Sequence, residues 1–597
     1  MDKPQSTRRR KARWRVMVLL VLCCAVFALF LARLAWLQFA MADHYAQKMA
    51  EASSASYTLP QHAARGAITD RSGTVLAQDE TVYDVYLRVP APPGTNLRET
   101  VNTIAALTGG KDVETQLAAF CSAVSAGELP VTQGLDSIGT AAYYRAGLVQ
   151  SGAVRLAARG VRRWPDGTIL PHTLGFTGPI TAEQWPAARA QGLAMDATIG
   201  QNGLEAAYDT LLRGRDGQLQ INVGLDGVTR ETVQTSTPIP GCTLVLTLDA
   251  DLQKTLQTAL QNQMDTLRTT KGIGAGREVR AGAAVVVDVR TGGILAAASL
   301  PDFDLSRYRS DYAALSADSA APLLDRVCQG LYAPGSAFKP AVAAAALTAG
   351  IDPAATVNCT GKYFYYSNYH PGCLQYGHRG PVDLRTALEY SCNIFFYDTG
   401  RRLGVDTFSA MARQLGLAND TGVEITAAQG RLTWSTDTNY QDGLTLMAAI
   451  GQGNTAVTPL QLAQYAAALA NYGRKPTLHF ADRAVQPATG AAVWQYEPAF
   501  TEIPGGEAVF GPIRDGMKRM AQTARALREA PVTVAAKTGS PQLADTLPGG
   551  SHYVNSVLIG YAPADDPQIA MAVVLEYGGG GANAAPVMRA VLDAWFE

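Results

Sequence analysis

Residues 283–299 read Ala-Ala-Val-Val-Val-Asp-Val-Arg-Thr-Gly-Gly-Ile-Leu-Ala-Ala-Ala-Ser, and this stretch decides the fold of the larger part of the chain. Ala283 to Asp288 is an apolar run with the length and composition of a buried strand, and Ile294 to Ser299 is a second such run. The glycines of Arg290-Thr-Gly-Gly293 between them are typical of a turn. The stretch therefore predicts two strands joined by a turn.

A similar pattern occurs near the C-terminus. Ser556 to Tyr561 and Ile569 to Tyr577 predict two strands around the turn-forming residues 563–567, Pro-Ala-Asp-Asp-Pro. A glycine-rich hinge at 578–581 and a closing helix over about 583–596 follow. Because helices are predicted between the two strand pairs, we expect strands from distant segments to meet in one sheet. This part of the chain is predicted to mix α and β structure.

The N-terminus predicts a membrane anchor. Residues 1–15 carry seven Lys and Arg side chains against the single acid Asp2, and residues 16–32 carry no charge. Arg33 interrupts the apolar run, which continues to Ala40, but a long Arg side chain near a helix end can reach the membrane interface. The basic excess predicts a cytoplasmic tail at 1–15, an anchor at 16–40, and all residues from 41 onward outside the cytoplasmic membrane.

Two other interpretations of this segment are open. Cleavage as a signal peptide has one small-x-small candidate, Ala40-Met41-Ala42, although the apolar region is longer than such peptides need. Lipoprotein processing at Cys23 is disfavoured because Leu22 occupies the position where a small residue is required. The single-pass anchor remains the favoured prediction.

Length and composition exclude several classes of protein. The 597 residues exceed what one core usually holds, so more than one domain is expected. With 47% hydrophobic and 17% charged residues, the chain is neither disordered nor of low complexity. Fifty basic and 51 acidic side chains give a net charge of −1, which makes a dedicated nucleic-acid binder improbable. Only eight cysteines occur, too few for a fold held together by disulfides.

A domain boundary is predicted at about residue 235. Ser236-Thr-Pro-Ile-Pro-Gly241 has the composition of a linker, and the strand-like run Thr243 to Leu248 follows it. The first part, 41–235, mixes short strands such as Tyr83 to Leu87 with glycine-punctuated helices and contains no candidate catalytic set. We interpret it as a spacer or docking domain that precedes a second domain, 236–597.

Ser336 and Lys339 are the first candidate catalytic pair. They lie in Leu331-Tyr-Ala-Pro-Gly-Ser-Ala-Phe-Lys-Pro340, and no other serine of the chain has a lysine three residues later. Residues i and i+3 share a helical face, so the amine can reach the hydroxyl. A lysine can activate a serine only if its pKa falls from about 10.4, as burial or a second cation would cause. The pair alone is weak evidence for catalysis, because a serine and a lysine at the start of a helix are usually a cap and a solvated charge.

Two further triplets strengthen this hypothesis. Ser391-Cys-Asn393 supplies a hydroxyl and an amide that could relay a proton and orient a peptide. Lys537-Thr-Gly539 predicts a strand segment suited to a carboxylate, with a glycine where close approach is needed. Each triplet also has an ordinary structural interpretation, such as a strand followed by a turn. Their order and spacing together favour a single site.

These three motifs resemble those of the penicillin-recognising serine acyltransferases. Their surroundings are similar to class B penicillin-binding proteins of the elongation or sporulation type, which cross-link peptidoglycan. Residues 65–77, 203–214 and 451–461 carry this wider resemblance. It implies an α+β chain with a single transmembrane helix, an elongated pedestal or dimerisation-type domain at 41–235, and a transpeptidase domain at 236–597. A central antiparallel sheet flanked by helices is expected in the latter. No glycosyltransferase-sized domain is seen before the pedestal, which favours class B over class A.

The resemblance implies a mechanism for the three motifs. Ser336 would attack the penultimate D-alanine of a stem peptide after Lys339 takes its proton, and Ser391 would relay that proton to the released D-alanine. An amine from a neighbouring stem peptide would then resolve the acyl-enzyme. A β-lactam would remain trapped on Ser336, because its leaving group stays tethered.

The same resemblance implies a substrate-binding set. Asn393 would hold the donor's amide, and Lys537 with Thr538 would bind its carboxylate. Gly539 and Ser540 would complete the set, with the backbone amides of Ser540 and the nucleophile forming the oxyanion hole. No cofactor is required for this chemistry. The implied partners are peptidoglycan stem peptides, β-lactam antibiotics, a polytopic membrane glycan polymerase and other cell-wall synthesis proteins, with no nucleic acid.

A cysteine-rich stretch offers a candidate metal site. Cys359, Cys373, His378 and Cys392 have the ligand types of a structural zinc site, although their spacing does not match a zinc finger. His370 is a possible substitute ligand. A disulfide between Cys359 and Cys373 and free buried thiols are the alternatives.

Three functions are compatible with these residues. The favoured one is a D,D-transpeptidase that forms a serine acyl-enzyme. With water as acceptor, the same acyl-enzyme would make a D,D-carboxypeptidase or a β-lactamase, although neither needs a long docking domain. A scaffold without catalysis that activates a glycan polymerase is the third, and the intact motifs argue against it.

Overall fold

The computed structural model describes most of the chain. It covers residues 6–51, 55–89, 94–108, 127–195, 197–223, 229–373, 378–548 and 550–597. These residues fall into two compact units, which are described separately. Unit 1 comprises Met1–Ala63, Val82–Arg159 and Arg215–Ile239, and unit 2 comprises Ala64–Thr81, Gly160–Gly214 and Pro240–Glu597. The domain boundary at 235–236 remains a prediction.

The predicted N-terminal anchor forms a helix. α1 (Ser6–Ala35) continues into a short π-helical turn, Trp36–Ala40. The segment Arg13–Ala40 is 28 residues long, has a mean hydropathy of 2.7 in its most apolar window, and buries none of that window against the protein. Its length and composition are those of a helix that can cross a membrane.

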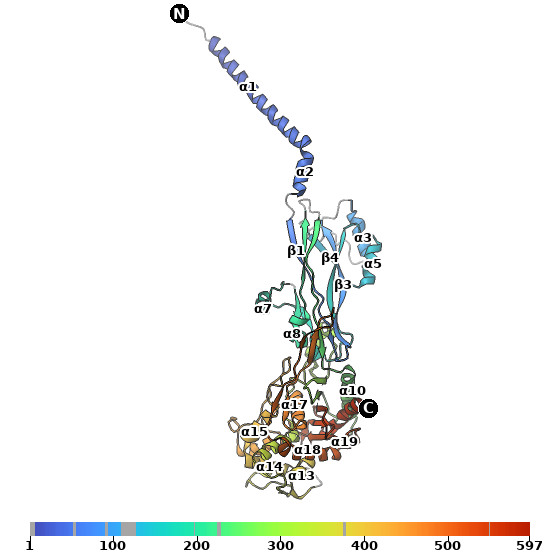
Figure 1. The fold of residues 1–597 in the computed structure, drawn as a ribbon, viewed down its shortest axis with the longest axis vertical. Coiled ribbons are helices and arrows are strands. Elements are labelled where there is room, and N and C mark those ends of the chain that lie inside the picture. Colours follow the sequence, from blue (N-terminus) through green and yellow to red (C-terminus); the bar gives the residue numbers. More distant parts are fainter. Residues whose placement is uncertain are drawn as a thin grey trace. The chain divides into compact units, whose positions relative to one another are not determined.

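Besides α1 and α2 (Ala42–Glu51), unit 1 contains β-strands and the helices α3 and α5 (Figure 1). β1 (Ala55–Gln61), β8 (Gly217–Val223) and β9 (Thr229–Ser236) form an antiparallel sheet in that order. The long strand β3 (Val75–Val89), which includes the predicted strand at Tyr83, pairs antiparallel with β4 (Gly127–Leu135). Helices α3 and α5 contribute apolar side chains to the small core beside these strands, and their bounds are Leu97–Leu107 and Ser137–Arg145.

A five-stranded antiparallel sheet lies in unit 2, which confirms the expectation for this part of the chain. Its strand order is β12-β11-β23-β22-β19. Both predicted hairpins are present, and β11 pairs with β23 to join them. The strands run over Gly282–Asp288 (β11), Ile294–Leu300 (β12), Ala535–Gly539 (β19), Ser556–Ala562 (β22) and Ile569–Leu575 (β23).

Both faces of this sheet are buried. Side chains alternate between the two faces along a strand, so each strand contributes residues to two cores. Val285 and Val287 belong to one core, and Ala284 and Val286 belong to the other. The first core also holds α12 (Lys339–Thr348) and α17 (Pro459–Ala470). The second lies under α10 (Ala250–Arg268) and α20 (Ala585–Phe596). The short, nearly all-apolar strands are explained by this double burial.

Two stretches that carry the family resemblance meet inside unit 2. Glu205, from 203–214, is fully buried and pairs with Arg65 from 65–77, with 2.6 Å between the Arg65 Nε and Glu205 Oε2 atoms. Its other oxygen accepts a hydrogen bond from Arg162 Nε, also at 2.6 Å. Arg65 Nη1 additionally contacts Asp209 Oδ1 at 2.7 Å. A buried carboxylate needs such pairing, which ties these distant segments to each other.

Candidate active site

Ser336 and Lys339 lie at a junction between two kinds of helix. A 3₁₀-helical turn over Gly335–Phe338 leads directly into α12, which begins at Lys339. In a 3₁₀ turn the side chains at i and i+3 point in the same direction, so Ser336 and Lys339 share one side of this turn. Ser336 is partly accessible, whereas Lys339 is completely buried. The local fold therefore leaves the serine accessible to solvent and keeps the amine buried.

The strand with the Lys-Thr-Gly motif packs against this turn. A Cβ atom on Gly539 of β19 would lie 2.2 Å from the carbonyl oxygen of Pro334, so only glycine fits. The sequence suggested that this glycine admits a substrate, but the group that approaches it is the turn that carries Ser336. Behind the turn, Gly335 N donates a hydrogen bond to Gly451 O at 2.9 Å. Gly451 opens the stretch 451–461.

The hydroxyl of Ser391 lies between two buried lysines. Lys339 Nζ contacts its Oγ at 3.1 Å, and Lys537 Nζ donates to the same atom at 3.0 Å. Lys339 Nζ also donates to the Ser391 carbonyl oxygen and to Asn393 Oδ1, both at 2.7 Å. Ser391 adopts φ +56°, in the left-handed region that disfavours residues other than glycine. Such a backbone conformation at a polar cluster is typical of a functional site.

The two lysines have lowered pKa values. Burial lowers the pKa of Lys339 to about 7, although the nearby thiols of Cys392 and Cys373 act in the opposite direction. Burial, together with the charge of Lys339, lowers the pKa of Lys537 well below its usual range. Two amines that share one hydroxyl in a desolvated site cannot both keep a proton easily. A neutral Lys339 near pH 7 is the state that a general base requires.

The remaining predicted residues surround the same point. The Asn393 side chain also donates, through Nδ2, to Gly372 O at 3.2 Å. Lys537 Nζ makes a further contact with Thr538 O at 3.1 Å. Ser540 is exposed just after β19, and its Oγ accepts a hydrogen bond from Gly581 N at 2.8 Å. The structure thus brings the three motifs together, and the role of each residue remains a prediction.

The four candidate metal ligands also come together. Cys359, Cys373, His378 and Cys392 are all buried, and their ligand atoms lie within 4.8 Å of one another. None of the cysteines that the structure describes forms a disulfide. His370 does not belong to the cluster, because its side chain is exposed and packs on a neighbouring aromatic ring.

Sequence reasoning did not single out some residues of the site. Phe396 lies under the amine of Lys339, which is 5.4 Å from the ring centroid, and the Gly372 carbonyl anchors Asn393. Phe396 follows the Ser-x-Asn triplet by one helical turn, at i+3 from Asn393, and this spacing is the signal that could have identified it. The position of Gly372 depends on loop geometry and had no such signal.

Comparison with known protein families identifies the family to which the chain belongs. The family described as the penicillin-binding protein transpeptidase domain matches residues 282–593, which is more than half of the chain. The chain belongs to the penicillin-binding protein transpeptidase family. Its residues 60–246 match a second family, the penicillin-binding protein dimerisation domain. Both domains expected from the resemblance are therefore present in this penicillin-binding protein.

Individual relatives agree with this assignment. The peptidoglycan D,D-transpeptidase MrdA of Acinetobacter baumannii is 29% identical over 605 aligned residues, covering 97% of this penicillin-binding protein and 86% of the relative. A chain from a structure of a peptidoglycan synthase complex is 28% identical, with a TM-score of 0.72 and 98% of each chain covered. A Helicobacter pylori penicillin-binding protein (PBP2), solved in complex with MreC, shares the fold with a TM-score of 0.74 and 23% identity, over 91% of this chain and 99% of that one.

Proposed function

We propose that this penicillin-binding protein is a serine D,D-transpeptidase that cross-links peptidoglycan stem peptides and is acylated by β-lactams. The observation that carries the proposal is the Ser391 hydroxyl held between Lys339 and Lys537, beside the turn that presents Ser336. The Ser336 hydroxyl, the Lys339 amine and the Ser391 hydroxyl together form a path for the proton that Ser336 loses.

Acylation begins with the neutral amine of Lys339. A neutral amine has two N–H donors, which the acceptors Ser391 O and Asn393 Oδ1 can satisfy at 2.7 Å each. Its lone pair is then left to accept the Ser336 proton. The Ser336 oxygen forms a bond to the carbonyl carbon of the penultimate D-alanine. The peptide C–N bond breaks, and Ser391 passes the proton to the leaving amine of the terminal D-alanine.

Two groups of residues would stabilise negative charge on the substrate, one at its carboxylate and one at the oxyanion. The substrate's carboxylate lies against Lys537 and Thr538, and its arrival favours the charged form of Lys537 that burial otherwise disfavours. The backbone amides of Ser336 and Ser540 bind the oxyanion, each such donor being worth about 2.7–4 kcal/mol. A Cβ atom on Gly335 would lie 3.2 Å from Ser540 N, which supports the placement of both amides at the same turn.

Transfer to a second strand completes the reaction. The amine of a neighbouring stem peptide attacks the acyl carbon, a new C–N bond forms, and the Ser336 oxygen leaves with a proton returned through Lys339. With a β-lactam the leaving amine stays tethered to the acyl group and blocks the acceptor. The acyl-enzyme then persists.

The test uses the full-length protein in detergent micelles, incubated with a fluorescent penicillin and analysed by intact-mass spectrometry. One covalent adduct is expected, lasting much longer than minutes, and Ser336→Ala should give none. Ser540→Ala keeps the backbone amide and is the matched control, expected to acylate. An adduct that hydrolyses within seconds would identify a β-lactamase or carboxypeptidase instead. Folded protein without any adduct would favour the non-catalytic scaffold.

Membrane position and partners follow from the N-terminal helix and from unit 1. We propose that the N-terminus lies in the cytoplasm and the catalytic unit outside, because residues 1–15 are strongly basic, with Arg13–Ala40 as the single-pass anchor. Relatives occur in structures with MreC and in a peptidoglycan synthase complex. By analogy, the anchor and the pedestal of this chain dock to a polytopic glycan polymerase and other cell-wall synthesis proteins.

We further propose that the cysteine cluster holds one structural zinc ion. Three thiols and an imidazole are ligand types that zinc prefers, and a mutual spacing within 4.8 Å needs only slight contraction around a tetrahedral ion. The Nε2 atom of His378 lies 3.6 Å from the Sγ atom of Cys373, so this ring nitrogen faces the thiols of the cluster. Bound zinc supplies no chemistry to the reaction and fixes the Ser391-Cys-Asn turn against the 359–373 loop.

Metal analysis of the full-length protein, purified without chelator, tests this site. About one zinc per chain is expected, and Cys373→Ser should reduce this to near zero and lower the melting temperature. Cys328→Ser, which removes a buried cysteine outside the cluster, is the matched control and should retain the ion. A parent protein without zinc would exclude the proposal.

A further inference from the structure

A second cleft lies in unit 2, outside the three catalytic motifs. Its volume is about 490 Å³, within the range of roughly 300–1,000 Å³ typical of ligand sites. Segments from 172, 201–207, 303–329 and 424–426 form its lining, and none of them contains a residue of the active site. The mechanism proposed above does not use this cleft.

Aromatic rings form one wall of the cleft. Phe303 and Tyr308 line it, with their ring centroids 5.6 Å apart. Phe176 packs on Tyr308 at 4.7 Å, and His172 meets Phe303 edge-on at 5.1 Å. Rings that support one another in this way present a rigid, amphipathic surface to a ligand.

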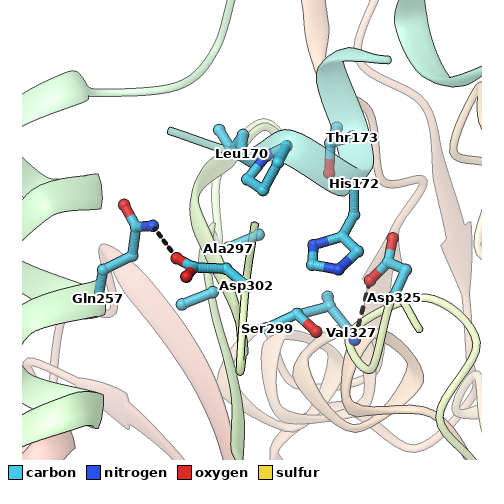
Figure 2. A pocket seen from close by; sticks show the side chains of 11 residues that line it. Leu170, His172, Thr173, Gln257, Ala297, Ser299, Asp302, Asp325 and Val327 are labelled. Carbon is cyan, nitrogen blue, oxygen red and sulfur yellow. Dashed lines mark hydrogen bonds between the residues drawn. The ribbon is translucent and has the colours of Figure 1, made fainter. Parts of the chain in front are cut away.

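Two polar residues that line the cleft, His172 and Asp325, are held in place by hydrogen bonds. Figure 2 shows the His172 ring in a small adjoining cavity, between the carboxylates of Asp302 and Asp325. Contact between His172 Nε2 and Pro322 O, at 2.7 Å, fixes the ring. Asp325 is 8% exposed, and its Oδ1 accepts hydrogen bonds from Val327 N and Cys328 N. His172 and Asp325 therefore line the larger cleft in fixed positions.

Further polar groups at the rim remain available to a ligand. The Gln329 amide, the Thr426 hydroxyl and the Tyr308 hydroxyl line the cleft or its edge, and none has a hydrogen-bond partner within the described ranges. They provide donors and acceptors together. A ligand with several hydroxyl or amide groups can satisfy them.

The charges of the side chains that line the cleft limit the class of ligand that can bind there. Asp325 and Glu424 are the charged side chains among the described lining residues, and neither lysine nor arginine occurs there. Carboxylates repel phosphates, anionic lipid headgroups and the carboxylate end of a stem peptide. An uncharged polyhydroxyl ligand with an apolar face suits the cleft best, and a sugar ring has these properties.

The cleft is connected to the active site by a short backbone ladder. Ala428 N bonds Cys328 O at 2.8 Å, Tyr332 N bonds Val457 O at 2.9 Å, and Gly335 leads into the turn of Ser336. Seven residues along the backbone separate Gln329, at the cleft, from Ser336. One continuous segment of the chain therefore joins the cleft to the turn that carries Ser336.

We propose that this cleft binds uncharged N-acetylhexosamine units of the glycan strand whose stem peptide reacts at Ser336. The choice of this polymer rests on the proposed transpeptidase function. The aromatic wall stacks on a sugar face, and Asp325, Gln329 and Thr426 bond the hydroxyl and acetamido groups. The cleft would hold the strand in register while its peptide is cross-linked.

Titration of the full-length protein with tetra-N-acetylchitotetraose, a neutral sugar without peptide, tests the proposal by calorimetry. The wild type should bind, and Tyr308→Leu and Gln329→Ala should each weaken the affinity by about fivefold to tenfold. Tyr144→Leu is the matched control, because this ring is 49% exposed on α5 and does not line the cleft. It should leave the affinity unchanged.

Penicillin acylation, measured on every variant, separates this proposal from the proposed function. Acylation should be equal in all of them, because no cleft residue belongs to the reacting site. A wild type that reacts with penicillin but does not bind the sugar would overturn the cleft assignment alone. Binding that persists in the Tyr308→Leu/Gln329→Ala variant, or that is lost when penicillin occupies Ser336, would also overturn it. Loss of penicillin reactivity in the wild type would instead contradict the transpeptidase.

Discussion

At the scale of single residues, the proposed mechanism requires the amine of Lys339 to be uncharged. Burial lowers its pKa to about 7, because the amine is removed from water in a pocket closed by Phe396. The nearest acceptors are a carbonyl, a hydroxyl and an amide oxygen, and none of these carries the full charge that would hold the proton on the amine.

We predict that penicillin acylation accelerates as the pH rises through about 7. Below its pKa, Lys339 holds a proton and cannot accept the one from Ser336, so the rate at pH 5.5 should be about 30-fold below the plateau. Stopped-flow fluorescence between pH 5.5 and 8.5 measures this. Lys339→Arg stays protonated and should be inactive at every pH, whereas a flat profile in the wild type would contradict the base assignment.

Two substitutions of Ser391 can separate the effect of its strained backbone from the effect of losing its hydroxyl. Its φ of +56° favours glycine, and its hydroxyl bridges the two lysines. Ser391→Gly and Ser391→Ala both remove the hydroxyl and should slow acylation by about 10²–10⁴-fold. The glycine variant should be more stable than the alanine variant by about 1 kcal/mol, since only alanine is strained there. Thermal unfolding compares the two, and equal activity of either with the wild type would exclude the relay.

At the scale of elements, the site depends on how closely β19 approaches the turn at Gly335–Phe338. Antiparallel pairing with β22 holds β19 at the edge of the sheet, and the missing side chain of Gly539 lets Pro334 O come near. The alanine-rich face of α12 packs into the core behind the same turn. Strand, turn and helix therefore set the positions of Lys537 and Ser336 together.

Gly539→Ala should disrupt this contact. The new Cβ would lie 2.2 Å from a backbone oxygen that cannot rotate away, so strand and turn must separate. We expect a loss of about 1–3 kcal/mol in unfolding free energy and at least a tenfold slower acylation. Gly580→Ala, whose Cβ would meet nothing within 4 Å, is the control and should behave like the wild type. Normal acylation of Gly539→Ala would refute the packing argument.

At the scale of the whole molecule, unit 2 is larger than the catalytic sheet. It takes in 64–81 and 160–214, segments that precede the predicted boundary at 235. The Glu205 carboxylate, completely buried between Arg65 and Arg162, fixes these segments to one another. Residues of the same segments, His172 among them, line the proposed sugar cleft.

Glu205→Ala should strongly destabilise unit 2. Removing the carboxylate takes away the partner that Arg65 and Arg162 share and leaves them only Asp209 and Asp79, which should cost about 3 kcal/mol. Glu80→Ala breaks the exposed pair with Arg163 and should change stability by less than about 1 kcal/mol. Chemical denaturation followed by tryptophan fluorescence measures both. Similar stability of the two variants would show that the buried network does not hold the unit together.

The sequence by itself determined the features whose signals are local. The apolar runs at 283–299 and 556–577 predicted the strands, the uncharged segment 16–32 predicted the anchor helix, and three short motifs predicted the site residues. Periodicity and residue type act within a few positions along the chain, so they can be recognised without coordinates. The resemblance then extended these signals to both domains, and the family matches agree with it.

Tertiary structure alone decided the rest. It placed the Ser391 hydroxyl between two lysines, gave that residue a left-handed backbone, and showed that Gly539 faces the turn that carries Ser336. It also assembled the cleft from segments between 172 and 426. These features arise from contacts between residues far apart in the chain, where packing and desolvation act on all partners at once. No local pattern encodes them, because the physical cause exists only after the chain has folded.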